Sequence, residues 1–310
     1  MKAIILTGFG GADKLCSAEL PRPVIDQGQV LIKVKSLSIN PIDIKTREGQ
    51  GIADLITERP VILGWDISGV VEESRSTSHN VGDEIFGMNN YPGHGKAYAE
   101  FVAAEALHFT LKPSNISHKE SAAACLAALT AWQNLTVHYQ VTKGDRILIH
   151  GGSGGVGHFA IQMAKYLGAY VVCTSSVENR EFVLGLGADE HIDYKAVNFE
   201  DHINDVSFVL NTQNEHIAER SLKVVKSGGT IINIGSEVTE ELRHKAGAKH
   251  INVFRTRVKS NGGDMRKIAE LLETQRLMVY IDSIFDLDDM ASAHQKLSSG
   301  KTVGKIVLTT

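Results

Sequence analysis

The stretch Arg146–Gly157, RILIHGGSGGVG, decides the fold class of this chain of 310 residues. Its aliphatic run, Ile147–Ile149, is typical of a buried strand, and the segment after the last glycine, HFAIQMAKYLG, has the apolar spacing of a helix. Between them lies Gly152-x-Gly154-x-x-Gly157, a spacing that permits a tight turn, close approach of a pyrophosphate, and packing of the helix on the strand. Because N–H groups at a helix N-terminus bind phosphates, we predict a dinucleotide-binding unit rather than an ordinary strand-to-helix turn.

The end of the next strand indicates which dinucleotide is bound. This strand, Tyr170–Cys173, continues into Thr174, Ser175 and Ser176, where an NAD-binding unit would carry a carboxylate for the ribose 2′-hydroxyl. Hydroxyls stand there instead, and Arg180 follows closely, so a 2′-phosphate would meet polar and cationic partners. This pattern favours NADPH, although Arg180 could also be a solvated surface charge.

Composition narrows the class of protein. The chain is 43% hydrophobic with a net charge of -4, which gives no reason to expect nucleic acid or an anionic membrane as partner. The apolar run Ala3–Leu6 is too short for a signal peptide, and the longest apolar stretch, Ala122–Trp132, is too short to span a membrane. We therefore expect a cytoplasmic protein with no membrane partner.

The pattern of elements changes near residue 118. The preceding part alternates short strand-like runs with turns, namely Ala3–Leu6, Val30–Lys35, Ile67–Val71, Glu84–Phe86, Phe101–Ala103 and Phe109–Leu111. Then a long helix, Ser117–Leu135, opens a series of alternating strands and helices that includes a helix at Val177–Leu186, which predicts a parallel sheet covered on both faces. A helix at Met265–Glu273 and a closing strand, KIVLTT, follow. We expect that strand to return to the first domain, giving a β-rich domain of residues 1–117 and 276–310 and a nucleotide-binding domain of residues 118–275.

Several longer motifs resemble one known family. They include INPIDIKTREG, VILGWDISGVV, HGGSGGVGHFAIQMAK and SGKTVGKIVL, and they are similar to those of the zinc-independent quinone oxidoreductase branch of the medium-chain dehydrogenase/reductase superfamily. The form NPxDxKxR is similar to plant-type quinone/enone and alkenal reductases. The resemblance implies an α/β protein with a GroES-like partial barrel and a Rossmann doubly wound parallel sheet. It also implies an NADPH-dependent enzyme that forms a homodimer or homotetramer.

The resemblance also bears on metal binding. Zinc-dependent members of the superfamily have a cysteine and a histidine ligand where this chain has Asn40 and Trp65, and residues 80–100 contain no cysteine. The three cysteines, Cys16, Cys125 and Cys173, are too far apart to suggest a zinc site or a disulfide framework. Without thiolate and imidazole ligands a catalytic Zn²⁺ has no ligand set, so we expect no metal. We read Asp66, beside Trp65, as a structural acid.

Hydride transfer without a metal requires an acceptor that is already electrophilic, such as a quinone or the activated C=C of an enone or enal. Where the closest branch has a tyrosine, this chain has Lys45, which shifts the expectation towards enones and enals. We assign catalytic roles to Asn40, Asp43 and Lys45, with the amide of Asn40 and the ammonium of Lys45 as donors to the developing oxyanion. In the alternative, Asn40 and Asp43 shape a turn and Lys45 points to water.

The resemblance carries coenzyme contacts to further positions. We expect them at Thr130, Gly152, Ser153, Gly154, Gly155, Val156, Gly157, Ser175, Ser176, Arg180, Tyr194, Gly235 and Ser236. Thr130 is expected to face the nicotinamide amide, and Gly235 and Ser236 to lie on the nicotinamide side. Tyr194 could instead be a partly buried aromatic residue at a strand end.

Two alternatives from other functional classes stay open. One is a non-catalytic NADPH-binding protein similar to the crystallins and RNA-binding relatives of this branch, which would bind NADPH without turnover. The other is an NADPH-dependent enoyl-thioester reductase, which a basic surface for a CoA or carrier phosphopantetheine would favour.

Overall fold

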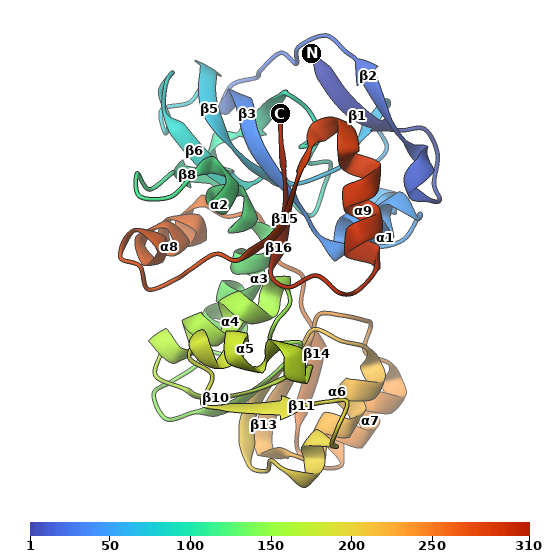
Figure 1. Cartoon of the computed structure of the whole chain (residues 1–310), viewed down its shortest axis with the longest axis vertical. Helices are drawn as coiled ribbons and strands as arrows, with labels where there is room; N and C mark the ends of the chain where they lie inside the picture. Colours follow the sequence, from blue (N-terminus) through green and yellow to red (C-terminus); the bar gives the residue numbers. More distant parts are fainter. The chain divides into compact units, whose positions relative to one another are not determined.

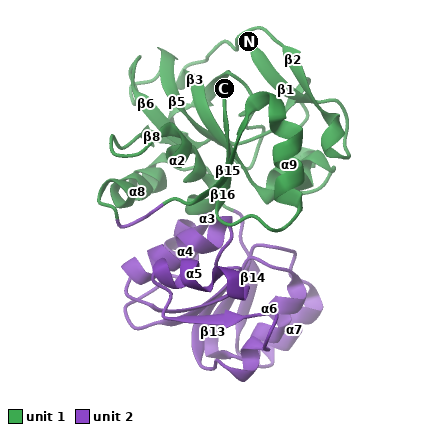
Figure 2. Ribbon diagram, in the orientation of Figure 1, with its two compact units in different colours: residues 1–129, 258–275, 279–310 green, residues 130–257, 276–278 purple.

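The computed structural model describes all residues, 1–310, and divides the chain into two compact units (Figure 1, Figure 2). The first unit contains residues 1–129, 258–275 and 279–310, and the second contains residues 130–257 and 276–278. Compared with the division expected from sequence, the first unit also includes residues 118–129 and 258–275. The physical reason for the latter is that helix α8, Gly262–Glu273, packs on strand β8, Phe109–Leu111.

The second unit is built on a six-stranded sheet in which every neighbouring pair is parallel. Its order is β11 (Glu190–Asp193), β10 (Tyr170–Ser175), β9 (Arg146–His150), β12 (Val206–Asn211), β13 (Val225–Asn233) and β14 (Asn252–Arg255). The helices are α4 (Gly155–Tyr166), α5 (Arg180–Gly185), α6 (Glu215–Ser221) and α7 (Glu240–Gly247). The strand order reverses between β9 and β12, and in such sheets ligands bind beyond the carboxyl ends of the strands at this point. The predicted Rossmann sheet is confirmed.

The centre of this sheet is fully buried because its strands carry apolar residues on both faces. Ile147, Leu148 and Ile149 of β9 are all inaccessible to solvent, as are Val209 and Leu210 of β12. Helices cover both faces of a parallel sheet, so neighbouring residues of one strand can both be apolar. This rigid core holds the strand ends in place.

The first unit has two sheets. A seven-stranded sheet has the order β15 (Ile281–Asp286), β16 (Lys305–Thr309), β3 (Gln29–Ile39), β5 (Asp66–Ser74), β6 (Glu84–Met88) and β8, with β7 (Phe101–Glu105) on β3. A three-stranded sheet joins β2 (Leu15–Glu19), β1 (Lys2–Leu6) and β4 (Val61–Ile62). The closing strand β16 pairs antiparallel with β3, so its predicted return to the first domain is confirmed.

The single helix predicted for Ser117–Leu135 is wrong. The structure has α2 (His118–Ala123) and α3 (Leu126–Gln133), followed by a π-helical turn, Asn134–His138. The break between α2 and α3 has a physical cause, because the Leu126 N–H donates to the buried Asp66 Oδ1 at 2.8 Å. A carboxylate on β5, far away in sequence, therefore interrupts an otherwise helical pattern.

Two other segments differ from the expected elements. The helix expected at Val177–Leu186 begins as a 3-10 turn, Val177–Asn179, before α5 starts at Arg180. The NPIDIK segment forms helix α1, Pro41–Arg47, with Asn40 at its N-cap and the Asn40 N–H bonded to Asp43 Oδ2 at 2.8 Å.

The last helix is α9, Met290–Ser298. None of the helices is both long and apolar enough to cross a membrane.

Candidate functional site

The glycine turn of the second unit connects β9 to α4. Gly154 is the N-cap of α4, and a Cβ at this position would meet only the Gly151 carbonyl oxygen, at 3.4 Å. A Cβ on Gly157 would overlap that same oxygen. The third glycine is therefore required for close packing, whereas the second leaves open space beside the N-terminus of α4, where N–H groups can bind a pyrophosphate.

His150, at the end of β9, forms hydrogen bonds with three residues that lie outside the glycine turn. Its Nδ1 lies 3.1 Å from Thr174 Oγ1, its Nε2 lies 3.0 Å from Ser221 Oγ, and its carbonyl accepts from Thr212 Oγ1 at 2.7 Å. Burial, with a smaller contribution from the charge of Arg220, lowers the pKa of His150 to about 3. The imidazole is therefore neutral and serves to hold strand ends together, a role that the sequence analysis did not assign.

The predicted coenzyme residues on the adenosine side lie at the ends of β9 and β10. Asn179 joins two of them, because its Nδ2 lies 3.2 Å from Ser153 Oγ and 3.3 Å from Ser176 Oγ. Ser175 is buried, with its hydroxyl 2.9 Å from His191 Nε2. The structure thus brings Ser153 and Ser176 together and turns the hydroxyl of Ser175 inward.

The charged residues of this region were only partly found from sequence. Arg180 is exposed, and its guanidinium donates to Glu181 at 2.7 Å. Sequence reasoning overlooked Glu178, whose carboxylate hydrogen-bonds the Ser176 hydroxyl and lies 3.5 Å from the ammonium of Lys195. The signal was available, since Glu178 lies about 20 residues past the glycine fingerprint.

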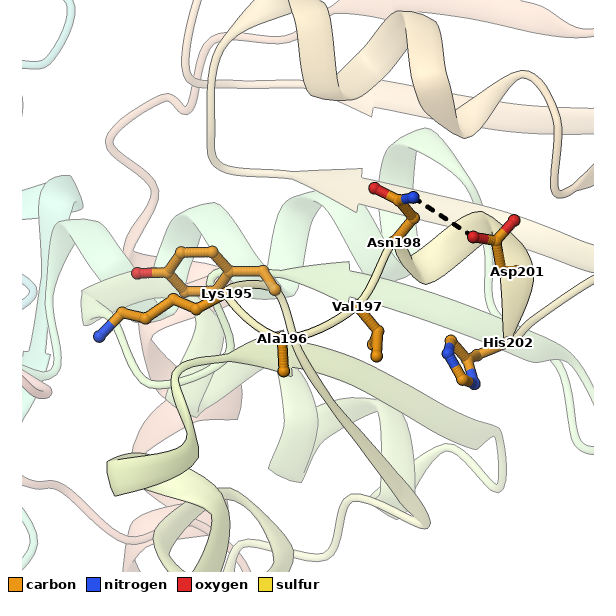
Figure 3. Close-up of a pocket in the computed structure, with 7 residues that line it drawn as sticks. Lys195, Ala196, Val197, Asn198, Asp201 and His202 are labelled. Atoms are coloured by element: carbon orange, nitrogen blue, oxygen red, sulfur yellow. Dashed lines mark hydrogen bonds between the residues drawn. The ribbon is translucent and has the colours of Figure 1, made fainter.

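Tyr194 and Lys195 follow β11 and begin a loop that lines a shallow cavity of about 360 Å³. Tyr194 is 59% exposed, and its N–H donates to the Ser175 carbonyl at 3.3 Å, so its backbone is fixed beside the end of β10. In Figure 3 the Lys195 side chain extends away from the end of the loop where Asn198 donates to Asp201. The tyrosine is therefore not the partly buried aromatic of the alternative interpretation.

The remaining predicted coenzyme residues lie elsewhere in the same unit. Gly235 and Ser236 follow β13, where Asn233 Nδ2 donates to the carbonyl and hydroxyl of Ser236, each at 3.0 Å. A Cβ on Gly235 would overlap the Gln213 carbonyl oxygen, so only glycine fits this turn. Thr130 is a buried residue of α3. The Asn233 Oδ1 accepts a hydrogen bond from Asn211 Nδ2 at 2.9 Å, and this residue was not identified from the sequence.

In the first unit, the predicted catalytic residue Asn40 belongs to a buried ionic cluster. Its Nδ2 donates to Asp66 Oδ2 at 2.8 Å, and its Oδ1 accepts from Lys305 Nζ at 2.5 Å. Lys305 also donates to the Ile39 carbonyl at 2.9 Å and lies 3.7 Å from Asp66 Oδ2. Asp66 accepts further from Ser38 at 2.6 Å, so this acid is satisfied as the sequence analysis expected.

Asp43 lies at the end of a second buried network. Tyr98 donates to Asp43 Oδ1 at 2.6 Å, and Tyr98 Oη lies 3.0 Å from His294 Nε2. His294 Nδ1 lies 3.2 Å from Arg47 Nη1. Arg47 can only donate, so His294 Nδ1 accepts its hydrogen bond and the imidazole proton is on Nε2. That Nε2–H donates to the Tyr98 oxygen, and the Tyr98 hydroxyl donates to Asp43. Burial raises the pKa of Asp43 to about 7 against the lowering effect of Tyr98.

The three predicted catalytic residues therefore differ in accessibility. Asn40 and Asp43 are 2% and 0% exposed, and their polar atoms are engaged within the first unit. Lys45, on the same helix α1, is half-buried. Burial favours the alternative in which Asn40 and Asp43 hold the loop and the helix, and Lys45 is the most accessible of the three side chains.

The residues present do not fit a zinc ion. No group of three or more His, Cys, Asp or Glu side chains is arranged to hold a metal. The cation nearest to the buried carboxylate of Asp66 is the Lys305 ammonium, and the amide of Asn40 bridges the two side chains. The positive charge beside Asp66 is therefore that of a lysine side chain.

Comparison with known proteins identifies the family. Residues 26–114 match the alcohol dehydrogenase GroES-like domain, and residues 186–308 match a domain described as zinc-binding dehydrogenase. A 2-methylene-furan-3-one reductase from Solanum lycopersicum is 34% identical over 320 residues, covering 99% of this chain and 79% of that protein. The chain belongs to the medium-chain dehydrogenase/reductase superfamily.

Two further relatives agree with this membership. An Arabidopsis thaliana protein named NADPH-dependent alkenal/one oxidoreductase, chloroplastic, is 32% identical over 99% of this chain and 79% of its own length. The solved structure of the quinone oxidoreductase from Coxiella burnetii is 34% identical and superposes with a TM-score of 0.94, covering 100% of this chain and 99% of that one. The superfamily recognised from the sequence motifs is confirmed.

Proposed function

We propose that this protein is an NADPH-dependent oxidoreductase that transfers a hydride to a quinone or to the activated C=C of an enone or enal, without zinc. The observation that carries the proposal is the glycine turn after β9, which leaves open space beside Gly154 at the N-terminus of α4. The names of the relatives support the reaction class, because they describe alkenal/one, furanone and quinone reduction.

In this proposal the second unit holds the coenzyme, which supplies a hydride when bound. The N–H groups at the start of α4 would bind the pyrophosphate, with Gly155 and Val156 in the first turn of the helix. Ser153, Ser176 and Arg180 would surround the 2′-phosphate, and Tyr194 would cover that side. Thr130, Gly235 and Ser236 would contact the nicotinamide end.

The first unit would supply the groups that meet the acceptor. Hydride addition to an enone or quinone leaves negative charge on an oxygen, which a preorganised cationic donor stabilises. Lys45 is that donor in our proposal and also the source of the proton. Asn40 and Asp43 position Lys45 indirectly, because they hold the start of α1 against the buried side chains of Asp66 and Lys305.

The experiment that tests this function is an NADPH-oxidation panel of quinones, enones, enals and an enoyl-CoA at matched concentrations. We expect turnover of the first three classes and little of the thioester. Tight NADPH binding without turnover of any acceptor would instead support a non-catalytic NADPH-binding protein. Turnover of enoyl-CoA well above the other classes would support the thioester reductase.

We further propose that the protein is cytoplasmic and forms a homodimer or homotetramer. Strand β14 ends the six-stranded sheet, and an unpaired sheet edge favours pairing with a second copy. The net charge of -4 gives no support for nucleic acid as a partner. Light scattering on the purified protein tests the assembly, and a monomer at micromolar concentration would contradict it.

A further inference from the structure

An acidic side chain lies where the coenzyme ribose is proposed to bind. Glu178 belongs to the 3-10 turn after β10. Hydrogen bonding by the Ser176 hydroxyl is the main cause that lowers the pKa of the Glu178 carboxyl. The same hydroxyl accepts from Asn179 Nδ2 at 3.3 Å. Because a hydroxyl has one hydrogen, Ser176 accepts the Asn179 N–H and has its own hydrogen to offer to Glu178, whose carboxylate stays largely exposed beside the strand end.

The cations of this region are already paired with acids. The Lys195 ammonium lies 3.5 Å from the Glu178 carboxylate, and the Arg180 guanidinium lies 2.7 Å from that of Glu181. Each positive charge that could attract a 2′-phosphate is therefore offset by a negative charge next to it. A site built only to hold this dianion would leave its cations unopposed.

We propose that Glu178 sets coenzyme selectivity: its carboxylate accepts the ribose 2′-hydroxyl of NADH and repels the 2′-phosphate of NADPH, with Lys195 as its counter-charge and as a second phosphate-binding cation. This inference rests on the proposed function as a nicotinamide-dependent oxidoreductase. The wild type then uses both coenzymes, and its preference for NADPH is smaller than Arg180 and Lys195 alone would give. A 2′-phosphate binds by drawing Lys195 away from Glu178.

Substitution of Glu178 should therefore change the ratio of the two affinities. At about 6 Å in a water-like dielectric, a phosphate dianion and a carboxylate repel enough to change an affinity roughly three- to tenfold after screening by salt. We expect Glu178→Gln to raise the NADPH-to-NADH affinity ratio by this factor. Lys195→Gln should lower the ratio by a similar factor, because it leaves the acid uncompensated.

A matched control is available at the opposite end of the sheet. Glu241 on α7 is exposed and forms an ion pair with Lys245, as Glu178 does with Lys195. Helix α7 packs on β14, whereas Glu178 follows β10, the second strand from the other edge. Glu241→Gln removes the same charge from the same unit and should leave the ratio unchanged.

The test measures dissociation constants of NADPH and NADH by nicotinamide fluorescence for the wild type and the three variants. Competition experiments with ADP-ribose and 2′-phospho-ADP-ribose, which lack the nicotinamide, test whether the change in affinity arises at the adenosine end. These experiments need no acceptor. A higher ratio in Glu178→Gln, a lower one in Lys195→Gln and no change in Glu241→Gln would support the inference. An unchanged ratio in Glu178→Gln, with coenzyme still bound, would overturn the inference and leave the proposed function standing. A wild type that binds neither coenzyme would refute both.

Discussion

Replacement of Lys305 by methionine should strongly destabilise the first unit. The ammonium and Asp66 are 3% and 0% exposed, and the ammonium is held by the Ile39 carbonyl, Asn40 Oδ1 and Asp66. Methionine fills similar volume but leaves a buried carboxylate without its cation, a change that costs about 3–5 kcal/mol. Domains are stable by only about 5–15 kcal/mol, so the variant should lose a large share of its stability.

Fluorescence can assign this loss to the first unit. The chain has two tryptophans, and only Trp65, fully buried, lies in the first unit. In a Trp132→Phe background, urea unfolding followed by Trp65 should show the loss as a lower midpoint. The thermal midpoint should fall by roughly 6–20 °C. Lys301→Met removes an exposed lysine that precedes β16; it is the control and should change stability by less than about 0.5 kcal/mol.

The loss should also depend on pH. Burial raises the pKa of Asp66 and Lys305 is the main group that lowers it, so removal of the lysine raises this pKa further. A carboxyl with a raised pKa in the folded state binds protons more readily there than when unfolded, so acid favours folding and the stability is lost as pH rises. The deficit of Lys305→Met should be smaller at pH 5 than at pH 8. A deficit below about 1 kcal/mol, or one equal at both pH values, would refute the buried-pair reasoning.

Other consequences of the structure can be measured directly. Gly157→Ala should cost about 1–3 kcal/mol and weaken NADPH binding at least tenfold, because the new Cβ overlaps the Gly151 carbonyl; near-wild-type binding in a titration would contradict this. Elemental analysis should find no stoichiometric zinc, and prolonged chelation should leave turnover unchanged. Lys45→Met should lower kcat severalfold while the NADPH dissociation constant and thermal midpoint stay near wild type; an unaltered kcat would make Lys45 a surface charge. Arg180→Ala should lower the NADPH preference by about tenfold, and an unchanged ratio would remove Arg180 from the site.

The coenzyme side of the molecule was predictable because its determinants are local in sequence. The strand Arg146–His150, the glycines and the helix that begins at Gly155 follow one another without interruption. Each step of that segment depends on backbone conformation and close packing, which glycine spacing and apolar periodicity report directly. Most strands of the first unit were found for the same reason, since alternating apolar residues encode a half-buried sheet, but β2 and β4 were not predicted.

The buried clusters of the first unit were not predictable because their members are distant in sequence. Lys305 and Asn40 are separated by 265 positions, and Tyr98 and His294 by 196. Nothing near Asn40 in the sequence shows that both ends of its amide are engaged. The break between α2 and α3 has the same origin, because it depends on the distant Asp66 rather than on any helix-breaking residue.

The lysine at the buried carboxylate bears on the choice of acceptor. A catalytic metal ion activates a carbonyl because its ligand sphere keeps one position open for the substrate oxygen. The Lys305 ammonium has only three hydrogens, and it faces the Ile39 carbonyl, the Asn40 amide oxygen and Asp66. It therefore has no open position to offer, and it stabilises the fold without acting as a Lewis acid. Lys305 therefore offers no help to an unactivated ketone, which agrees with the proposal that the acceptors are quinones, enones and enals, compounds that are already electrophilic before they bind.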